Sequence, residues 1–222
     1  MYKLFLKRIL DIILSLVLII ISAPLMVIIA ILIRKDGGKA IFIQERSGRY
    51  NQTFKIYKFR SMIQNNDVHD FKCEDVITPF GKFLKDTSLD ELPQLFNILK
   101  GDMSFIGPRP WITDYSNYFT VNQMRRLDVR PGLTGLAQCN GRNNISIMEK
   151  INYDLYYVEN ISLLMDIKVF IKTIKSVFTK NGAVSSKFAI KSELEELMLQ
   201  PRYIQIKQKN VYPKINILLD RI

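Results

Sequence analysis

The longest apolar run in the chain lies near its N-terminus. The 22 residues from Ile12 to Ile33 contain no charged side chain, and Arg34-Lys35-Asp36 closes the run. As a straight helix the run would extend about 33 Å, enough to cross a hydrocarbon core of about 30 Å. It is too long for a signal peptide and has no convincing cleavage site. The pattern therefore predicts a membrane-anchoring segment over residues 1–36.

Ser22-Ala23-Pro24 falls in the middle of this apolar run. A proline inside a helix removes one backbone donor and clashes with the preceding turn, so Ser22 and Pro24 mark an expected break in the helix. Basic residues flank both ends of the run, so the positive-inside rule does not clearly place the two ends on opposite sides of the membrane. We expect a re-entrant helical hairpin, and a kinked single span is the alternative.

From residue 37 onward the pattern indicates short elements of mixed type. Residues 53–60 alternate as in a strand, after a turn over residues 47–51. Helical patterns cover residues 78–86, 115–126, 151–160 and 162–180. In the first of these we expect Phe80, Phe83 and Leu84 to face inward. The predicted fold class is α+β, with a mainly helical domain over residues 37–180, a short β-hairpin, and a C-terminal extension over residues 181–222 to which no role is assigned.

The helix predicted over residues 162–180 is amphipathic. Its apolar face comprises Leu163, Leu164, Ile167, Phe170, Ile171, Ile174 and Phe178, and Lys168, Lys172 and Lys175 lie on the other face. This pattern is typical of a helix in a membrane interface. It is equally typical of a surface helix packed on a protein core. The N-terminal apolar run favours the interfacial interpretation.

Composition limits the function classes. The formal net charge is +11, so the surface attracts phosphate, although charge alone does not distinguish a nucleotide, a bilayer or nucleic acid. Cys73 and Cys139 have no metal-binding spacing, and the single His69 has no partner motif. A zinc site or a Ser–His triad therefore lacks its ligands. The glycines form neither a P-loop nor a dinucleotide fingerprint.

Two adjacent carboxylates, Asp90 and Glu91, precede Pro93 and an apolar helical stripe of Leu92, Leu95, Phe96 and Leu99. Ser88 and Glu91 fit a capping box, which would make the acids a structural helix start. Pro93 argues against that interpretation, because it fits better as the first residue of a helix that ends at Gly101. The acids would then lie on the approach to the helix, where one can act as a nucleophile and the other can bind a hard cation.

Basic residues occur on both sides of the acid pair. Lys58 and Arg60 share one face of the predicted strand with two apolar residues, which suits a cleft that receives an anion or, alternatively, an ordinary basic strand end. Arg109 stands between two prolines in Gly107-Pro108-Arg109-Pro110, so its backbone is held extended and loses little freedom on binding an anion.

Together these motifs resemble those of the bacterial sugar transferases, the monotopic phosphoglycosyl transferases that begin glycan assembly on polyprenyl phosphate. The resemblance covers Lys3 to about Phe178. It rests on motifs in family order: Lys7-Arg8-x-x-Asp11, the membrane proline, Gln44-x-Arg46-x-Gly48, Lys58 to Met62, Ser88 to Asn97, Lys100 to Ser104, Gly107 to Pro110, Pro131 to Gln138 and Asn140-Gly141-Arg142. One departure is Ala23, since family members often place serine immediately before the proline.

The resemblance implies transfer of a sugar phosphate from a UDP-sugar to polyprenyl phosphate, with release of UMP. By motif position, Asp90 corresponds to the nucleophile that forms a phospho-aspartyl intermediate, and Glu91 to the ligand of Mg²⁺. Lys58, Arg60 and Arg109 would bind the substrate phosphates. The expected location is the bacterial inner membrane with the catalytic domain on the cytoplasmic face, and the expected partners are both substrates and membrane lipid, not nucleic acid.

Several properties stay open at this stage. A membrane-tethered anion-binding protein would explain the charge and the anchor, but not the acid pair, which repels an anion unless a cation intervenes. A phosphohydrolase that uses Asp90 with water as acceptor is a further alternative. The sugar, the glycan pathway (capsule, exopolysaccharide, O-antigen or glycoprotein) and the oligomeric state, a homo-oligomer included, are not specified. We expect sugar specificity to lie in residues 64–75 or 111–122.

Overall fold

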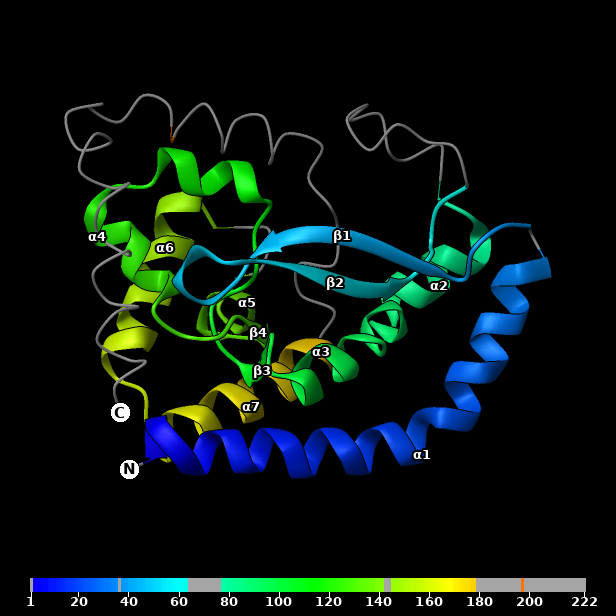
Figure 1. Ribbon diagram of the computed structural model, residues 1–222, viewed down its shortest axis with the longest axis horizontal. Helices are drawn as coiled ribbons and strands as arrows, with labels where there is room; N and C mark the ends of the chain where they lie inside the picture. The colour runs from blue at the N-terminus through cyan, green and yellow to red at the C-terminus, as the bar shows by residue number, and fades with distance from the viewer. Residues whose placement is uncertain (1, 36, 64–76, 142–144, 179–196, 198–222) are drawn as a thin grey trace.

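The N-terminal apolar run forms one long helix, α1 (Lys7–Lys35), which follows a π-helical turn at Tyr2–Leu6. In the computed structural model, which describes residues 2–35, 37–63, 77–141, 145–178 and Leu197, α1 runs along one side of the molecule and then bends to follow an adjacent side (Figure 1). Pro24 lies inside α1, and the Ser22 hydroxyl donates to the Leu18 carbonyl at 2.6 Å. Both features bend helices.

The expected break therefore takes the form of a bend within one continuous helix, without a loop between two separate helices. Both arms of α1 contact the rest of the chain. In the first arm, the Arg8 guanidinium donates to the carbonyls of Ile98 and Leu99, at 2.6 and 2.8 Å. In the second arm, Ile29 and Ile33 are buried in a cluster with residues of the hairpin and of α2.

The predicted strand is part of an antiparallel β-hairpin. Strand β1 (Ile41–Ser47) pairs with β2 (Thr53–Phe59) in a register that places Phe42 opposite Lys58 and Arg46 opposite Phe54. The turn between them contains the 3-10 helix Arg49–Asn51. The prediction of a turn over residues 47–51 and a strand after it is confirmed.

Helix α2 (Pro79–Asp86) begins at its predicted position, with the Thr78 hydroxyl accepting from the Gly81 N–H. A 3-10 helix, Leu89–Glu91, separates α2 from α3 (Gln94–Lys100). Gly101 ends α3 in a left-handed conformation, at φ 103°. The inward prediction for Phe83 is wrong, because Phe83 is exposed, whereas Leu84 is buried as expected. In the apolar stripe of α3, Leu95 is buried and Phe96 is exposed.

The second half of the domain is built around a short parallel pair of strands, β3 (Ser104–Ile106) and β4 (Gly132–Thr134). The single helix expected over residues 115–126 is wrong, because Thr120 starts a new helix with a capping box to Gln123 and so divides the segment. The elements there are the 3-10 helices Thr113–Tyr118 and Arg125–Leu127 with α4 (Val121–Met124) between them, and then α5 (Leu136–Cys139), α6 (Ile147–Glu159) and α7 (Leu163–Phe178).

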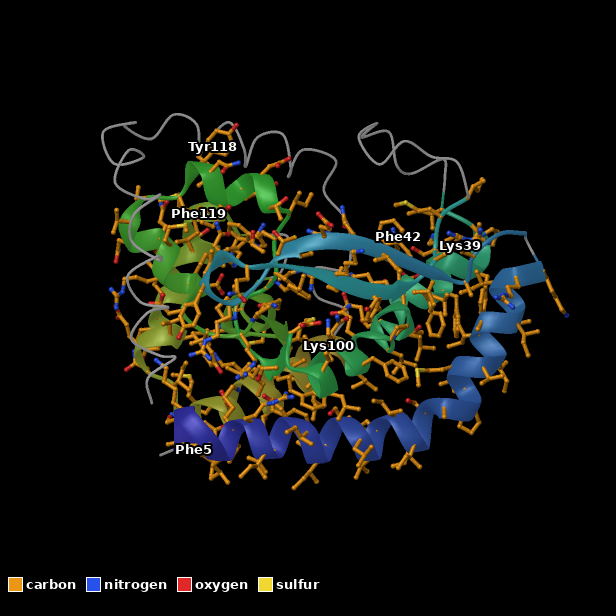
Figure 2. The ribbon with its side chains drawn as sticks, in the orientation of Figure 1. Phe5, Lys39, Phe42, Lys100, Tyr118 and Phe119 are labelled. Atoms are coloured by element: carbon orange, nitrogen blue, oxygen red, sulfur yellow. The ribbon has the colours of Figure 1, made fainter. Side chains whose placement is uncertain are left out.

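The apolar face of α7 is exposed. Within the described part of the helix this face comprises Leu163, Leu164, Ile167, Phe170, Ile171 and Ile174, and Val169 on the opposite side is buried. The alternative in which this face packs on a core is therefore wrong. Helix α7 lies beside the first arm of α1, whose outer side carries carbon-rich side chains that point away from the domain (Figure 2).

Helix α1 is long and apolar enough to cross a membrane by length and composition, and only 11% of its most apolar window is buried. A core helix of a soluble protein would be mostly buried. Together with the exposed face of α7, this indicates membrane association. The fold is thus a mixture of helices and two small sheets, as the α+β prediction stated. The predicted extension over residues 181–222 lies outside the described residues, apart from Leu197, which is buried against the cluster that includes Ile147 and Ile151.

Candidate active site

Asp90 and Glu91 lie in the short 3-10 helix just before α3, on the approach to the helix rather than inside it. Ser88 precedes them in a left-handed conformation, at φ 58°, and its side chain makes no capping hydrogen bond. The capping-box interpretation of Ser88 and Glu91 is therefore wrong. The interpretation in which Pro93 leads into α3 is confirmed, and it leaves both carboxylates available for contacts outside the helix.

Glu91 is held by two of the predicted cations. Its Oε1 atom accepts from Lys58 Nζ at 2.8 Å and from Arg109 Nη2 at 3.3 Å, and the side chains of Lys58 and Glu91 are 21% and 20% exposed. Burial alone would raise the pKa of Glu91. The charges and hydrogen bonds of Arg109 and Lys58 outweigh burial and lower this pKa to about 2. Glu91 is thus a permanent carboxylate at neutral pH.

Asp90 has the opposite environment. It is 8% exposed and, among the described residues, forms no ion pair. Burial, and then the adjacent charge of Glu91, raise the pKa of Asp90 to about 6. Neighbouring acids with pKa values driven apart in this way are typical of sites where two carboxylates perform different tasks.

Asn97 of α3 holds this helix, which follows the acids, against strand β2, which carries Lys58. It is fully buried in α3, its Nδ2 donates to the Lys55 carbonyl at 2.7 Å, and its Oδ1 accepts from the Tyr57 N–H at 3.1 Å. These bonds replace a neighbouring strand along the free edge of β2. The strand that carries Lys58 is therefore attached directly to the helix that follows the acid pair.

Arg109 is positioned by a second arginine. The Arg126 guanidinium donates to the Arg109 carbonyl at 2.8 Å and pairs with Asp154 Oδ2 at 2.6 Å, and the side chains of this ion pair are 0% and 2% exposed. The ring of Trp111 lies 3.9 Å from the same guanidinium. A buried ion pair and an aromatic face thus hold the segment that presents Arg109 to Glu91.

A cavity of about 1260 Å³ lies between α1 and the domain, and its wall includes Lys58, Asp90, Glu91 and Arg109. Other parts of its wall are apolar and come from α1 and α7: Leu10, Leu14, Val17, Leu18 and Ile21 of α1, and Leu163, Ile167 and Phe170 of α7. The cavity therefore joins a charged site to a surface that carries exposed apolar side chains.

Arg60 does not belong to this group. It follows the end of β2, and its guanidinium donates to the Ile33 carbonyl at 3.1 Å and to the Gly37 carbonyl. It thus neutralises the partial negative charge at the C-terminal end of α1. The structure brings together Asp90, Glu91, Lys58 and Arg109 and places Arg60 in a different role.

The site also contains a residue that was not predicted, Arg46, which lines the cavity with Arg109. The signal was present in the sequence, because Arg46 belongs to the motif Gln44-x-Arg46-x-Gly48. The hairpin register puts it on the same face as Lys58. Alternation within one strand could not show this, since it requires the pairing of the two strands.

The protein-family model for bacterial sugar transferases matches residues 2–180. The chain belongs to the bacterial sugar transferase family. Over 198 residues it is 41% identical to an undecaprenyl-phosphate galactose phosphotransferase of Salmonella typhimurium, in an alignment that covers 81% of this chain and 42% of the relative. It is 40% identical over 190 residues to a UDP-N-acetylgalactosamine-undecaprenyl-phosphate N-acetylgalactosaminephosphotransferase of Aeromonas hydrophila, covering 81% and 45%.

The chain thus spans less than half the length of these two relatives. A sugar transferase of similar extent is EpsL of Bacillus subtilis, a protein of uncharacterised function, which is 39% identical over 180 residues, with 80% of this chain and 89% of the relative covered. The match to the family therefore includes the membrane helix, the acid pair and α7.

In this member of the family the motif Lys7-Arg8-x-x-Asp11 attaches α1 to the domain. Lys7 pairs with Asp166 of α7 at 2.6 Å, and Asp11 accepts from the Ser104 hydroxyl and the Phe105 N–H, both at 3.1 Å. Arg8 binds the end of α3, as described above. The motif is therefore structural, and it fixes the apolar wall of the cavity relative to the acid pair.

Proposed function

We propose that this chain transfers a sugar 1-phosphate from a UDP-sugar to a polyprenyl phosphate and releases UMP. The observation that carries the proposal is the cavity, which joins the acid pair and its cations to apolar walls from α1 and α7. A water-soluble donor and a lipid acceptor need a site of this kind. The names of the Salmonella and Aeromonas relatives support the same chemistry, and a sugar transferase of this type would start capsule, exopolysaccharide, O-antigen or glycoprotein glycan assembly.

Asp90 is the proposed nucleophile. Its carboxylate attacks the phosphorus that carries the sugar, a new P–O bond forms to Asp90, and the bond to the phosphate oxygen of UMP breaks. An oxygen of the lipid phosphate then attacks the same phosphorus and restores the free carboxylate. Among the described residues no cation pairs with Asp90, and its raised pKa of about 6 makes it a better nucleophile than an ordinary aspartate while it is still ionised at pH 7.

Glu91 is the proposed ligand of Mg²⁺. The donor set fits, because Mg²⁺ is usually bound by one or two carboxylates together with substrate phosphates and water. In the described part of the chain both hydrogen bonds to Glu91 reach Oε1, which leaves Oε2 for the ion. When bound, the ion would neutralise charge on the diphosphate.

Lys58 and Arg109 supply the positive field around the phosphates. Without substrate they are neutralised by Glu91, and a diphosphate offers each of them stronger charge-assisted hydrogen bonds. An exchange from Glu91 to substrate would release Glu91 for the ion. Because the prolines and Arg126 already hold Arg109 in place, this exchange requires little movement of the backbone.

The membrane part of the proposal follows from α1 and α7. We place both ends of α1 on the cytoplasmic face, with the bend at Pro24 inside the bilayer in a re-entrant arrangement and the exposed face of α7 in the interface. UDP-sugars are cytoplasmic compounds, so the cavity must open on that side of the inner membrane. The Arg34-Lys35 and Lys7-Arg8 pairs at the two ends of α1 agree with this placement.

The test uses the purified full chain with Mg²⁺ and a panel of UDP-sugars, with and without polyprenyl phosphate. We expect UMP release that depends on the lipid for turnover, stops on chelation of the metal, and disappears in Asp90→Asn. Glu45→Gln, which alters an exposed acid on the outer face of the hairpin, is the matched control. Continuous release without lipid would instead indicate a hydrolase, and the absence of release from any donor would leave the anion-binding function.

A further inference from the structure

Arg46 is a cation of the cavity that is not neutralised by a partner of its own. Within the described residues its guanidinium makes one hydrogen bond, from Nη2 to the uncharged Gln44 Oε1 at 2.5 Å, and no ion pair. Its Nε is buried without a partner. Buried charges in folded proteins are normally paired, so such a guanidinium indicates that its anion comes from a ligand.

The carboxylates nearby cannot fill this role. Glu91 acts on Arg46 through space, but it already accepts from both Lys58 and Arg109. Burial and then the charge of Arg109 lower the pKa of Arg46 to about 10, so it is still a cation at neutral pH. Lys58 and Arg109 both pair with Glu91, so Arg46 is the cation of these three that makes no ion pair among the described residues, and a bound phosphate would supply one.

The register of the hairpin separates Arg46 from Lys58. Lys58 lies opposite Phe42, four positions from Arg46 along β1, which corresponds to about 13 Å at about 3.3 Å per residue. The Lys58 end of the sheet lies against Glu91. The Arg46 end lies against Trp111, whose carbonyl accepts from the Ser47 N–H at 3.0 Å. The side chains of Arg46 and Lys58 therefore reach toward Glu91 and Arg109 from different ends of the hairpin.

We infer that Arg46 binds the phosphate that stays on the leaving nucleoside monophosphate, and that Lys58 binds the phosphate that is transferred to Asp90. The inference rests on the proposed function. Since the transferred phosphate must lie against Asp90, the cation at the far end of the hairpin is the one placed for the other phosphate. The cavity continues there along Trp111, Ile112 and Tyr115, which provide an aromatic and apolar wall for the nucleoside.

The experiment measures binding of UMP to the full chain in detergent with Mg²⁺, by titration calorimetry. We expect Arg46→Gln to bind UMP about 10- to 100-fold more weakly than the wild type, because it loses a charge-assisted hydrogen bond to phosphate. Arg46→Lys retains the charge and should lie between the two. Lys55→Gln removes the same charge from the exposed face of the same hairpin and should bind UMP within about twofold of the wild type.

Uridine, which has no phosphate, serves as the second probe. Uridine should bind more weakly than UMP, and with the same affinity to the wild type and to Arg46→Gln. Equal uridine affinities would show that the substitution has not disrupted the cavity as a whole. Arg46→Gln should also melt at or above the wild-type temperature, because it removes a half-buried cation that makes no ion pair among the described residues. UMP affinity of Arg46→Gln within about twofold of the wild type would overturn the inference, as would an equal loss of uridine binding.

The turnover assay with polyprenyl phosphate separates this inference from the proposed function. A wild type that transfers sugar phosphate, with UMP affinity independent of Arg46, leaves the function standing and removes the role of Arg46. A wild type that neither releases UMP from any UDP-sugar nor binds UMP overturns both. A transferring wild type whose UMP affinity requires Arg46 supports both.

Discussion

At the scale of single residues, the site depends on the contrast between Asp90 and Glu91. The two residues are adjacent in sequence, yet Glu91 accepts hydrogen bonds from Lys58 and Arg109, whereas Asp90 is buried and forms no ion pair among the described residues. Ionising the buried Asp90 side chain costs free energy in the folded state. If Asp90 is the nucleophile, as we propose, its replacement should raise stability and abolish activity.

Asp90→Asn should therefore be inactive and more stable than the wild type. A carboxyl whose folded-state pKa is raised binds its proton more tightly when folded, so the chain loses stability as the pH rises from about 4 to about 6. A shift from 3.8 to about 6 corresponds to at most about 3 kcal/mol above pH 6. We expect Tm in detergent with chelator to rise by about 2–6 °C at pH 7.5 and to be unchanged at pH 4.

The exposed acid Asp114 offers the control, since Asp114→Asn should change Tm at neither pH. A lower Tm of Asp90→Asn at pH 7.5 would show that the Asp90 carboxylate makes stabilising contacts, contrary to the environment described above.

At the scale of elements, the segment that carries Arg109 is held by the buried pair of Arg126 and Asp154. Arg126→Met leaves the Asp154 carboxylate buried and unpaired, and we expect it to lower stability by about 3–5 kcal/mol. The double variant Arg126→Met with Asp154→Leu removes both charges and should recover most of that stability. The Arg109 carbonyl still lacks its donor in the double variant, so lipid-dependent UMP release should stay at least about tenfold below the wild type.

Arg125→Gln is the matched control, because Arg125 is the exposed neighbour and pairs with the exposed Glu159 at 2.9 Å. It should alter neither Tm nor turnover. Wild-type activity in the stabilised double variant would show that Arg126 supports folding and does not position Arg109.

The same scale shows what the sequence could and could not predict. Proline placed the starts of α2 and α3 correctly and Gly101 placed the end of α3, because these residues act on the backbone locally. Inward and outward faces were less predictable: Phe83 and Phe96 are exposed, and the buried amide of Asn97 takes a place that an apolar residue would be expected to fill. The sequence did not show that Arg60 contacts the end of α1, or that Arg46 lies on the same face of the hairpin as Lys58. Both arrangements depend on contacts between distant parts of the chain.

At the scale of the whole molecule, α1 is the long apolar helix, lines the cavity, and contacts the domain at two separate places. Its bend contains Pro24, and its two arms contact different parts of the domain. A straight helix could not keep both sets of contacts, because its second arm would leave the cluster that buries Ile29 and Ile33. The contacts therefore require the bend, and the re-entrant arrangement within the membrane stays our proposal.

Cysteine labelling tests this arrangement. In a background with Cys73 and Cys139 replaced by serine, we expect Lys3→Cys and Lys39→Cys both to react with an impermeant reagent from the cytoplasmic side only. Lys55→Cys, on the exposed face of the domain, reports the side on which the domain lies. Labelling of Lys3→Cys and Lys39→Cys from opposite sides would establish a span and remove the re-entrant placement.

The most direct test of the central claim is the intact mass of the full chain after incubation with Mg²⁺ and its UDP-sugar in the absence of lipid. The predicted result is a mass increase equal to the sugar 1-phosphate less one water, mapped to Asp90, absent in Asp90→Asn and discharged by polyprenyl phosphate. Lipid-dependent UMP release from a chain that never carries this adduct, or an adduct on any other residue, would contradict it.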